Sequence, residues 1–124
     1  MIVVLHGTTR LRAESICKRG PDPDFIEPGG GVHAEGFSTC LASGPFPLGT
    51  PQEYARRKAE TFPNEGGPVI LLVEVPEELI VKAVEDVCFP LSQGVIQFDE
   101  GAGLEELCTA WVPLSKQILA VEGV

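Results

Sequence analysis

The stretch Ile2-Val3-Val4-Leu5-His6-Gly7-Thr8-Thr9 opens the chain and sets the first expectation for its fold. An apolar run that begins at the second residue predicts a strand, which ends in a His-Gly pair followed by two hydroxyl side chains. Because Gly7 has no Cβ, a flat ligand can lie against its main chain, with the imidazole of His6 beside it. The simpler alternative is a surface histidine at the end of a strand, followed by a turn glycine. This stretch alone leaves both interpretations open.

Length and composition predict one soluble domain over residues 1–124. The chain has 124 residues, of which 44% are hydrophobic, enough for a single core. Its 14 glycines and 11 prolines predict many loops. The longest apolar run, Val69 to Val73, is too short to cross a bilayer, and no basic segment precedes the first apolar residues as in a secretory signal. We therefore expect a cytoplasmic protein that does not enter a membrane.

The net charge of −9 argues against a general nucleic-acid surface. Seven of the nine basic residues nevertheless fall in two short segments, Arg10 to Arg19 and Arg56 to Lys58. These segments are either two solvated helix faces or a local positive rim around a phosphate-bearing ligand. The cysteines form no C-x-x-C pattern, so we expect buried thiols and no metal site; they are Cys17, Cys40, Cys88 and Cys108.

Two helices are expected in the first half of the chain. The spacing of Ala13, Ile16 and Cys17 predicts one over residues 11–19, ended by Gly20-Pro21. Thr50-Pro51-Gln52-Glu53 is a capping box that opens a second helix running to about Phe62. The expected buried stripe of this second helix is Ala55, Ala59 and Phe62.

Strands and loops are expected elsewhere. Pro21 to Glu35 predicts a long loop, in which His33 has no assigned role, and Gly36 to Cys40 predicts a short strand. Val69 to Val75 predicts a central strand, followed by a turn or one helical turn at Pro76 to Leu79. Further short strands are expected at Val81–Val84, Val87–Phe89, Val95–Phe98, Leu107–Val112 and Ile118–Val121. Helices confined to the first half indicate an α+β domain with a mixed or antiparallel sheet.

Three features follow one another in an informative order. They are His6-Gly7 on the first strand, Gly36-Phe37-Ser38-Thr39 before the capped helix, and Glu105-Glu106 at the start of a late strand. Their order and context resemble the ADP-ribosyltransferase fold, which includes poly(ADP-ribose) polymerase catalytic domains, bacterial toxins and RNA 2′-phosphotransferases. The resemblance covers roughly residues 1–121. It implies a split sheet and NAD as the substrate, with no metal.

The resemblance also implies roles for individual residues. His6 would hold a ribose hydroxyl of NAD, and the backbone of Gly7 would pair with the nicotinamide carboxamide. Phe37 or Ser38 would lie beside the nicotinamide. Glu106, with Glu105 as the alternative, would bind the 2′-hydroxyl of the nicotinamide ribose and stabilise the oxocarbenium-like sugar. The cofactor-binding set is completed by Thr8 and Thr39.

Glu106 is favoured over Glu105 because it lies immediately before Leu107 and twelve residues before Ile118. The alternative for both glutamates is a polar turn that also contains Asp99 and Glu100. If the implied roles hold, the chain is an ADP-ribosyltransferase or an NAD glycohydrolase.

The sequence also departs from the family pattern. Ser-Thr stands where a first-strand histidine is usually accompanied by a tyrosine, and no Glu-x-Glu is present. This mixture fits a divergent enzyme, or a module on the same fold that binds ADP-ribose, a nucleotide or a protein without turnover. A further alternative is an RNA 2′-phosphotransferase, which Leu5–Thr9, Ser15-Ile16, Pro68–Leu71 and Ser92–Val95 resemble. The acidic balance does not suit an RNA substrate.

Overall fold

The computed structural model describes residues 1–21, 37–42, 49–82, 84–85, 95–98, 101 and 103–121. Strands and helices alternate along the first part of the chain. In order, the elements are β1 (Ile2–Thr9), α1 (Arg10–Arg19), β2 (Phe37–Leu41), α2 (Gly49–Thr61), β3 (Pro68–Val75), α3 (Glu77–Lys82), β4 (Val84–Glu85), β5 (Val95–Phe98), α4 (Leu104–Ala110) and β6 (Lys116–Ala120).

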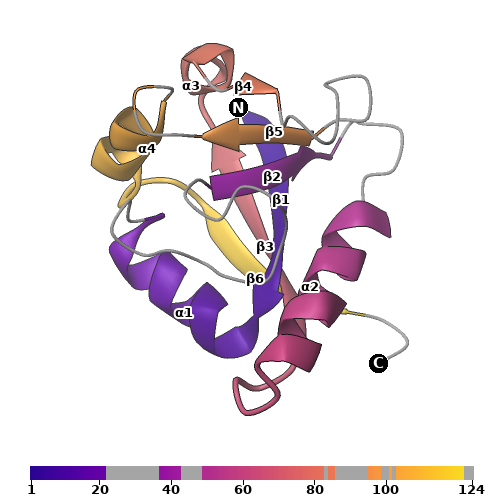
Figure 1. The fold of residues 1–124 in the computed structure, drawn as a ribbon. Helices are drawn as coiled ribbons and strands as arrows, with labels where there is room; N and C mark the ends of the chain where they lie inside the picture. The colour runs from indigo at the N-terminus through magenta and orange to yellow at the C-terminus, as the bar shows by residue number, and fades with distance from the viewer. Residues whose placement is uncertain are drawn as a thin grey trace.

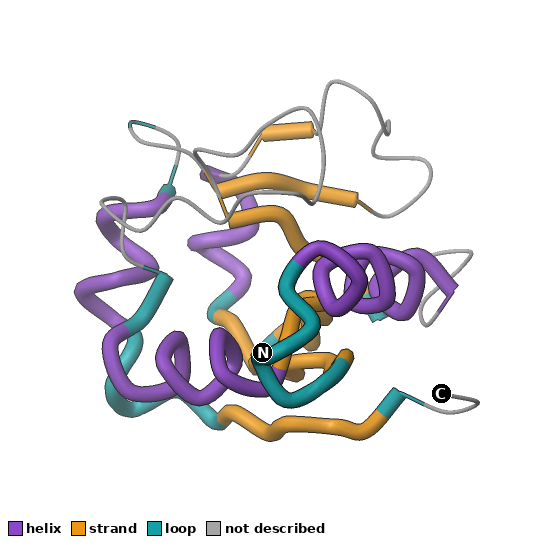
Figure 2. Tube along the Cα trace, turned by 60° about the horizontal axis from the view of Figure 1, so that its bottom comes forward, coloured by secondary structure: helices purple, strands orange, loops and turns teal. Residues whose placement is uncertain are grey.

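The six described strands form one sheet in the order β4-β5-β2-β1-β3-β6, and each pair of neighbours is antiparallel. The expected α+β class with an antiparallel sheet is therefore confirmed. Within the sheet, β2 and β5 lie crosswise to β1 and β3 (Figure 1). Figure 2 shows β6 as an outer strand that leads to the C-terminus, on the opposite side of the molecule from β4 and β5.

β1 is the central strand. It pairs with β3 along its whole length, from Ile2↔Val75 to Thr9↔Pro68, and its last six residues are buried. Because β1 continues to Thr9, His6 and Gly7 lie inside the strand. His6 is only 4% exposed. The interpretation of His6-Gly7 as a surface histidine with a turn glycine is wrong.

The two faces of the sheet carry separate cores, because side chains alternate along β1. Val4 lies in the larger core with Ile16 of α1, Leu79 of α3 and Leu107 of α4. Leu5 points to the other face, where it belongs to a smaller core with Ala55 of α2. Figure 1 shows this division, with α1 and α4 on one side of the sheet and α2 on the other.

The two helices expected in the first half are present, with a correction to α2. This helix begins at Gly49 and ends at Thr61, so Thr50 is its second residue and the expected start of the helix at a Thr50 cap is wrong. Ala55 is buried as expected, whereas Ala59 and Phe62 are only half-buried. Lys58 also lies on the buried face of this helix and is only 4% exposed. Lys58 therefore does not belong to a solvated face.

The second half differs more from expectation, because α3 and α4 show that helices are not confined to the first half. The strand expected at Leu107–Val112 is wrong: α4 covers Leu104–Ala110. Leu104, Leu107 and Trp111 recur at helical spacing and are all buried, so one helix face packs against the core. Val81 belongs to α3, and only Val84 of the expected strand at Val81–Val84 is in β4.

The remaining expectations are confirmed or concern residues that the structure does not describe. β5 and β6 match the strands expected at Val95–Phe98 and near Ile118–Val121. The strand expected at Val87–Phe89, and the loop with His33, lie outside the described residues, apart from Pro21. Among the residues that the structure describes, no helix has the length and apolar character needed to span a bilayer.

Candidate functional site at the fork between two strands

The pairing of β1 with β2 stops short of the end of either strand. It includes Val4↔Leu41 and Leu5↔Cys40, although β1 runs on to Thr9 and β2 begins at Phe37. Continuing the same register would place Gly7 opposite Ser38. We call this region the fork and define it by His6, Gly7, Phe37, Ser38 and Lys58.

The backbone of Gly7 points into the fork. Along an antiparallel strand, alternate residues direct their N–H and C=O groups to the same neighbouring strand. The amide of Ala42 donates to the carbonyl of Val3 at 3.0 Å, so Val3, Leu5 and Gly7 all face β2. A regular ladder would use the main chains of Gly7 and Ser38 for the next pair of hydrogen bonds.

Side chains donate hydrogen bonds to the carbonyl oxygens of both Gly7 and Ser38. His6 Nδ1 donates to the carbonyl oxygen of Ser38 at 2.6 Å. Lys58 Nζ donates to the carbonyl oxygen of Gly7 at 3.3 Å. His6 lies on the face of the larger core, while Lys58 reaches the fork from α2 on the opposite face. Side chains from both faces of the sheet therefore reach the fork.

The contact with Ser38 shows which ring nitrogen of His6 carries a hydrogen. A carbonyl oxygen only accepts hydrogen bonds, so Nδ1 carries a hydrogen. The ring also packs against Phe37, with centroids 4.4 Å apart. Phe37 in turn meets Trp111 edge-on at 6.2 Å. The contacts with Ser38 and Phe37 thus hold the ring of His6 in one orientation.

Gly7 serves a different purpose from the one first expected. A Cβ added to it would lie 1.9 Å from the carbonyl oxygen of Pro51, because the first turn of α2 packs directly against this residue. A flat ligand therefore cannot lie against the α2-facing side of Gly7. What Gly7 offers a ligand is its strand edge.

The remaining cofactor-binding candidates lie within the sheet. Thr8 is fully buried and pairs with Val69 of β3. Thr39 is also buried, and its hydroxyl donates to the carbonyl of Ile96 at 3.4 Å. Ser38 contacts His6 through its main chain. The structure therefore brings His6, Gly7, Phe37 and Ser38 together at the fork, while Thr8 and Thr39 hold the neighbouring strands.

The two candidate carboxylates lie on α4, away from the buried face of that helix. Glu106 is exposed, whereas Leu104 and Leu107 on either side of it are at most 1% exposed. Glu106 was expected to precede a strand and instead lies within a helix. The carboxylate of Glu105 accepts the amide of Gly101 at 3.1 and 3.2 Å. A solvated carboxylate stabilises a positive transition state far less than one in a dry cleft.

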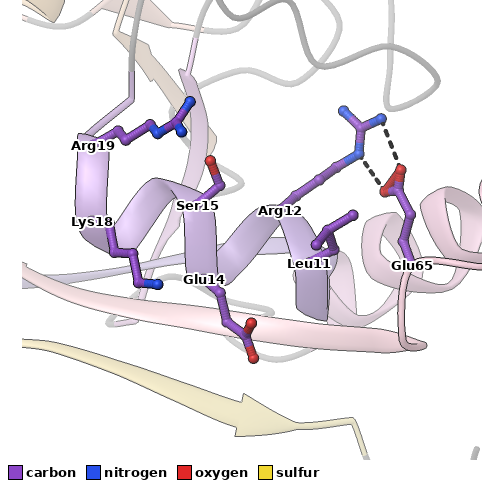
Figure 3. A pocket seen from close by; sticks show the side chains of 7 residues that line it. All are labelled: Leu11, Arg12, Glu14, Ser15, Lys18, Arg19 and Glu65. Carbon is purple, nitrogen blue, oxygen red and sulfur yellow. Dashed lines mark hydrogen bonds and ion pairs between the residues drawn. The ribbon is translucent and has the colours of Figure 1, made fainter.

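A depression of about 420 Å³ lies over the outer face of α1. Its lining consists of Leu11, Arg12, Glu14, Ser15, Lys18, Arg19 and Glu65. Figure 3 shows Arg12, Ser15 and Arg19 extending to one side of the helix, and Glu14 and Lys18 to the other. Arg12 forms an ion pair with Glu65, with Nε and Oε1 2.7 Å apart. Three cations and two carboxylates thus give this depression a small positive excess in an acidic protein.

Sequence reasoning missed Lys58. The signal that the sequence offered is the helical spacing of Pro51, Ala55 and Lys58. The structure shows that all three are buried. Of the described cysteines, Cys40 is buried as expected, whereas Cys17 and Cys108 are only half-buried. Burial raises the pKa of the Cys17 thiol, which keeps it protonated. The described residues contain no group of three or more His, Cys, Asp or Glu that could hold a metal ion.

Comparison of the chain with protein-family models, with curated proteins and with solved structures finds no match.

Proposed function

We propose that the fork binds the nicotinamide end of NAD, and that the chain is an ADP-ribosyltransferase or NAD glycohydrolase built on a split sheet of the ADP-ribosyltransferase type. The observation that carries this proposal is the strand edge of Gly7 beside a histidine whose ring orientation is fixed. A carboxamide has one acceptor oxygen and an NH₂ donor, which complements a backbone N–H and C=O. A ribose hydroxyl would donate to Nε2 of His6.

The contact between Lys58 and Gly7 is compatible with this pairing. A carbonyl oxygen has two lone pairs, so the oxygen of Gly7 can accept both the ammonium of Lys58 and one carboxamide hydrogen. The amide hydrogen of Gly7 faces the carboxamide oxygen in this arrangement. The pairing lies in the plane of the sheet and leaves the packing of α2 on Gly7 intact.

The α1 depression supports a place for the phosphate-bearing half of the dinucleotide. α1 begins directly after β1, so the part of the depression lined by Leu11 and Arg12 lies next to the end of the strand that carries His6 and Gly7. Arg12, Lys18 and Arg19 supply local positive charge for phosphate oxygens. Such a local field is needed in a chain whose net charge of −9 repels anions.

Cleavage of the bond between nicotinamide and ribose would develop positive charge on the sugar. A carboxylate facing this charge lowers the barrier, and Glu106, with Glu105 as the alternative, is the proposed source. The exposure of Glu106 favours a second candidate function: a module that binds NAD, ADP-ribose or another nucleotide without turnover. An RNA 2′-phosphotransferase is a weaker proposal, because the chain is acidic.

The test combines calorimetry with measurement of nicotinamide release at saturating NAD. His6 contacts the sugar in both the ground and transition states, so His6→Ala should raise KM more than it lowers kcat. Glu106→Gln removes charge that acts as the bond breaks, so it should lower kcat by about 10²–10³ and leave binding intact. Glu105→Gln tests the alternative carboxylate, and a loss of kcat confined to this variant would assign the role to Glu105. If the wild type and all variants bind NAD and none of them releases nicotinamide, the binding module is selected. Absence of NAD binding to the wild type would contradict both candidates.

A further inference from the structure

Lys58 is an unusual member of α2. Its neighbours Arg56 and Arg57 are exposed, whereas Lys58 is 4% exposed and donates to the Gly7 carbonyl at 3.3 Å. Lysine is rarely buried, because removing an ammonium group from water is unfavourable unless it gains strong polar contacts. The buried position therefore indicates a requirement at the fork that an apolar side chain does not meet.

That requirement follows from the missing backbone pair. A buried carbonyl needs a hydrogen-bond donor, and in a continued ladder the amide of Ser38 would supply it for Gly7. Lys58 supplies the donor from the side of α2. His6 takes the carbonyl of Ser38 from the other face in the same way. These two side chains thus donate to the two carbonyl groups that the next backbone pair of a continued ladder would use.

We propose that Lys58 is a positioning residue that keeps the fork open, so that the strand edge of Gly7 can receive a ligand. Without its ammonium group, the nearest replacement donor in the register is the amide of Ser38. Closing that pair would draw the Ser38 carbonyl onto the amide of Gly7 and away from His6. Loss of Lys58 therefore changes the tautomer of a histidine that belongs to a different element. The identity of the ligand as NAD rests on the proposed function, whereas the effect on His6 does not.

The test compares Lys58→Met, which keeps the aliphatic stem but has no donor, with Lys58→Arg, which keeps donor and charge. Arg57→Met is the matched control, because Arg57 is exposed on the same helix and forms an ion pair with Glu53. The chain contains two histidines, so ¹⁵N spectra of the imidazoles are simple to assign. We expect the Nδ1–H tautomer of His6 in the wild type, Lys58→Arg and Arg57→Met, and a shift toward Nε2–H in Lys58→Met.

Calorimetry on the same four proteins measures the consequence for binding. We expect Lys58→Met to weaken NAD binding by about tenfold or more, as for the loss of a hydrogen bond to a charged group, with Arg57→Met unchanged and Lys58→Arg close to wild type. An unchanged His6 tautomer in folded Lys58→Met would overturn the proposal. If the wild type does not bind NAD, the proposed function fails, while the tautomer measurement still decides the role of Lys58.

A measurement on the wild type keeps the proposal testable if Lys58→Met does not fold. Scalar couplings across hydrogen bonds should connect Lys58 Nζ to the Gly7 carbonyl carbon, and His6 Nδ1 to the Ser38 carbonyl carbon. A coupling from the Gly7 amide nitrogen to the Ser38 carbonyl carbon would show a closed backbone pair and would overturn the proposal.

Discussion

Gly7 shows how much a single missing side chain decides in this protein. Its φ angle is not positive, so glycine is not required there for an unusual backbone conformation. It is required for space, because the carbonyl of Pro51 occupies the position that a Cβ would take. The close approach of α2 in turn brings Lys58 within reach of the Gly7 carbonyl. One glycine thus links the packing of a helix to the polar contacts of the fork.

Gly7→Ala should lower the free energy of unfolding by about 3 kcal/mol, because the clash is with backbone atoms that no change of rotamer relieves. Urea denaturation followed by fluorescence of the single tryptophan measures this loss. Gly101→Ala is the control. An added Cβ there meets nothing within 4 Å, and its φ of +78° should cost about 1 kcal/mol of backbone strain. Equal losses for the two variants would contradict the packing argument.

At the scale of elements, α1 depends on the segment before β3 for its N-terminal hydrogen bonds. The hydroxyl of Thr9 accepts the amide of Arg12 at 3.4 Å and donates to the Glu65 carboxylate at 2.9 Å. The carbonyls of Glu65 and Gly67 accept the first amides of the helix, including that of Leu11 at 3.0 Å. A helix of ten residues is marginal by itself. These contacts therefore fix where the α1 depression lies relative to β1, and leave those amides unavailable to a phosphate.

Thr9→Val should lower the free energy of unfolding by about 1–2 kcal/mol, since it keeps the shape of the side chain but removes the cap and the bond to Glu65. Thermal or urea unfolding measures the change. Thr61→Val is the matched control, because the hydroxyl of Thr61 donates to the carbonyl of Arg57 at an exposed position, and its effect should stay within about 0.5 kcal/mol. A loss for Thr9→Val as small as the control would show that the cap contributes little.

At the scale of the whole molecule, Trp111 joins segments that are distant in the sequence. It is 2% exposed, its Nε1 donates to the carbonyl of Cys17 at 3.2 Å, and its edge meets the ring of Phe37. It also lies directly after α4. Trp111 therefore connects α1, β2 and α4, and supports the ring that packs on His6.

Trp111→Ala should lower the free energy of unfolding by about 3–5 kcal/mol, the range for truncation of a buried aromatic side chain. Unfolding is followed by circular dichroism, because the substitution removes the only tryptophan. Val112→Ala is the control, since the neighbouring Val112 is 84% exposed and should change stability by less than about 0.5 kcal/mol. Similar stabilities for the two variants would contradict a central role for Trp111.

Local patterns in the sequence were sufficient for the elements of the first half. The apolar run before His6 predicted β1, helical spacing predicted α1 and α2, and β-branched residues predicted β3. They were not sufficient for α4. Its apolar residues form a short run that also suits a strand, and only burial of Leu104, Leu107 and Trp111 on one side identifies the helix. The implied family, NAD and the roles of Glu106 and Glu105 stay predictions.

By itself, the sequence determined that His6 and Gly7 lie on a first strand and that Phe37 and Ser38 lie on a second one. Only the tertiary structure decided that β1 and β2 separate at these residues, that His6 is buried in one orientation, and that Lys58 reaches Gly7. The physical reason is the range of the contacts. The partners lie 32 and 51 residues apart, and a hydrogen bond over such a separation depends on strand register and helix packing, which no local pattern of residues encodes.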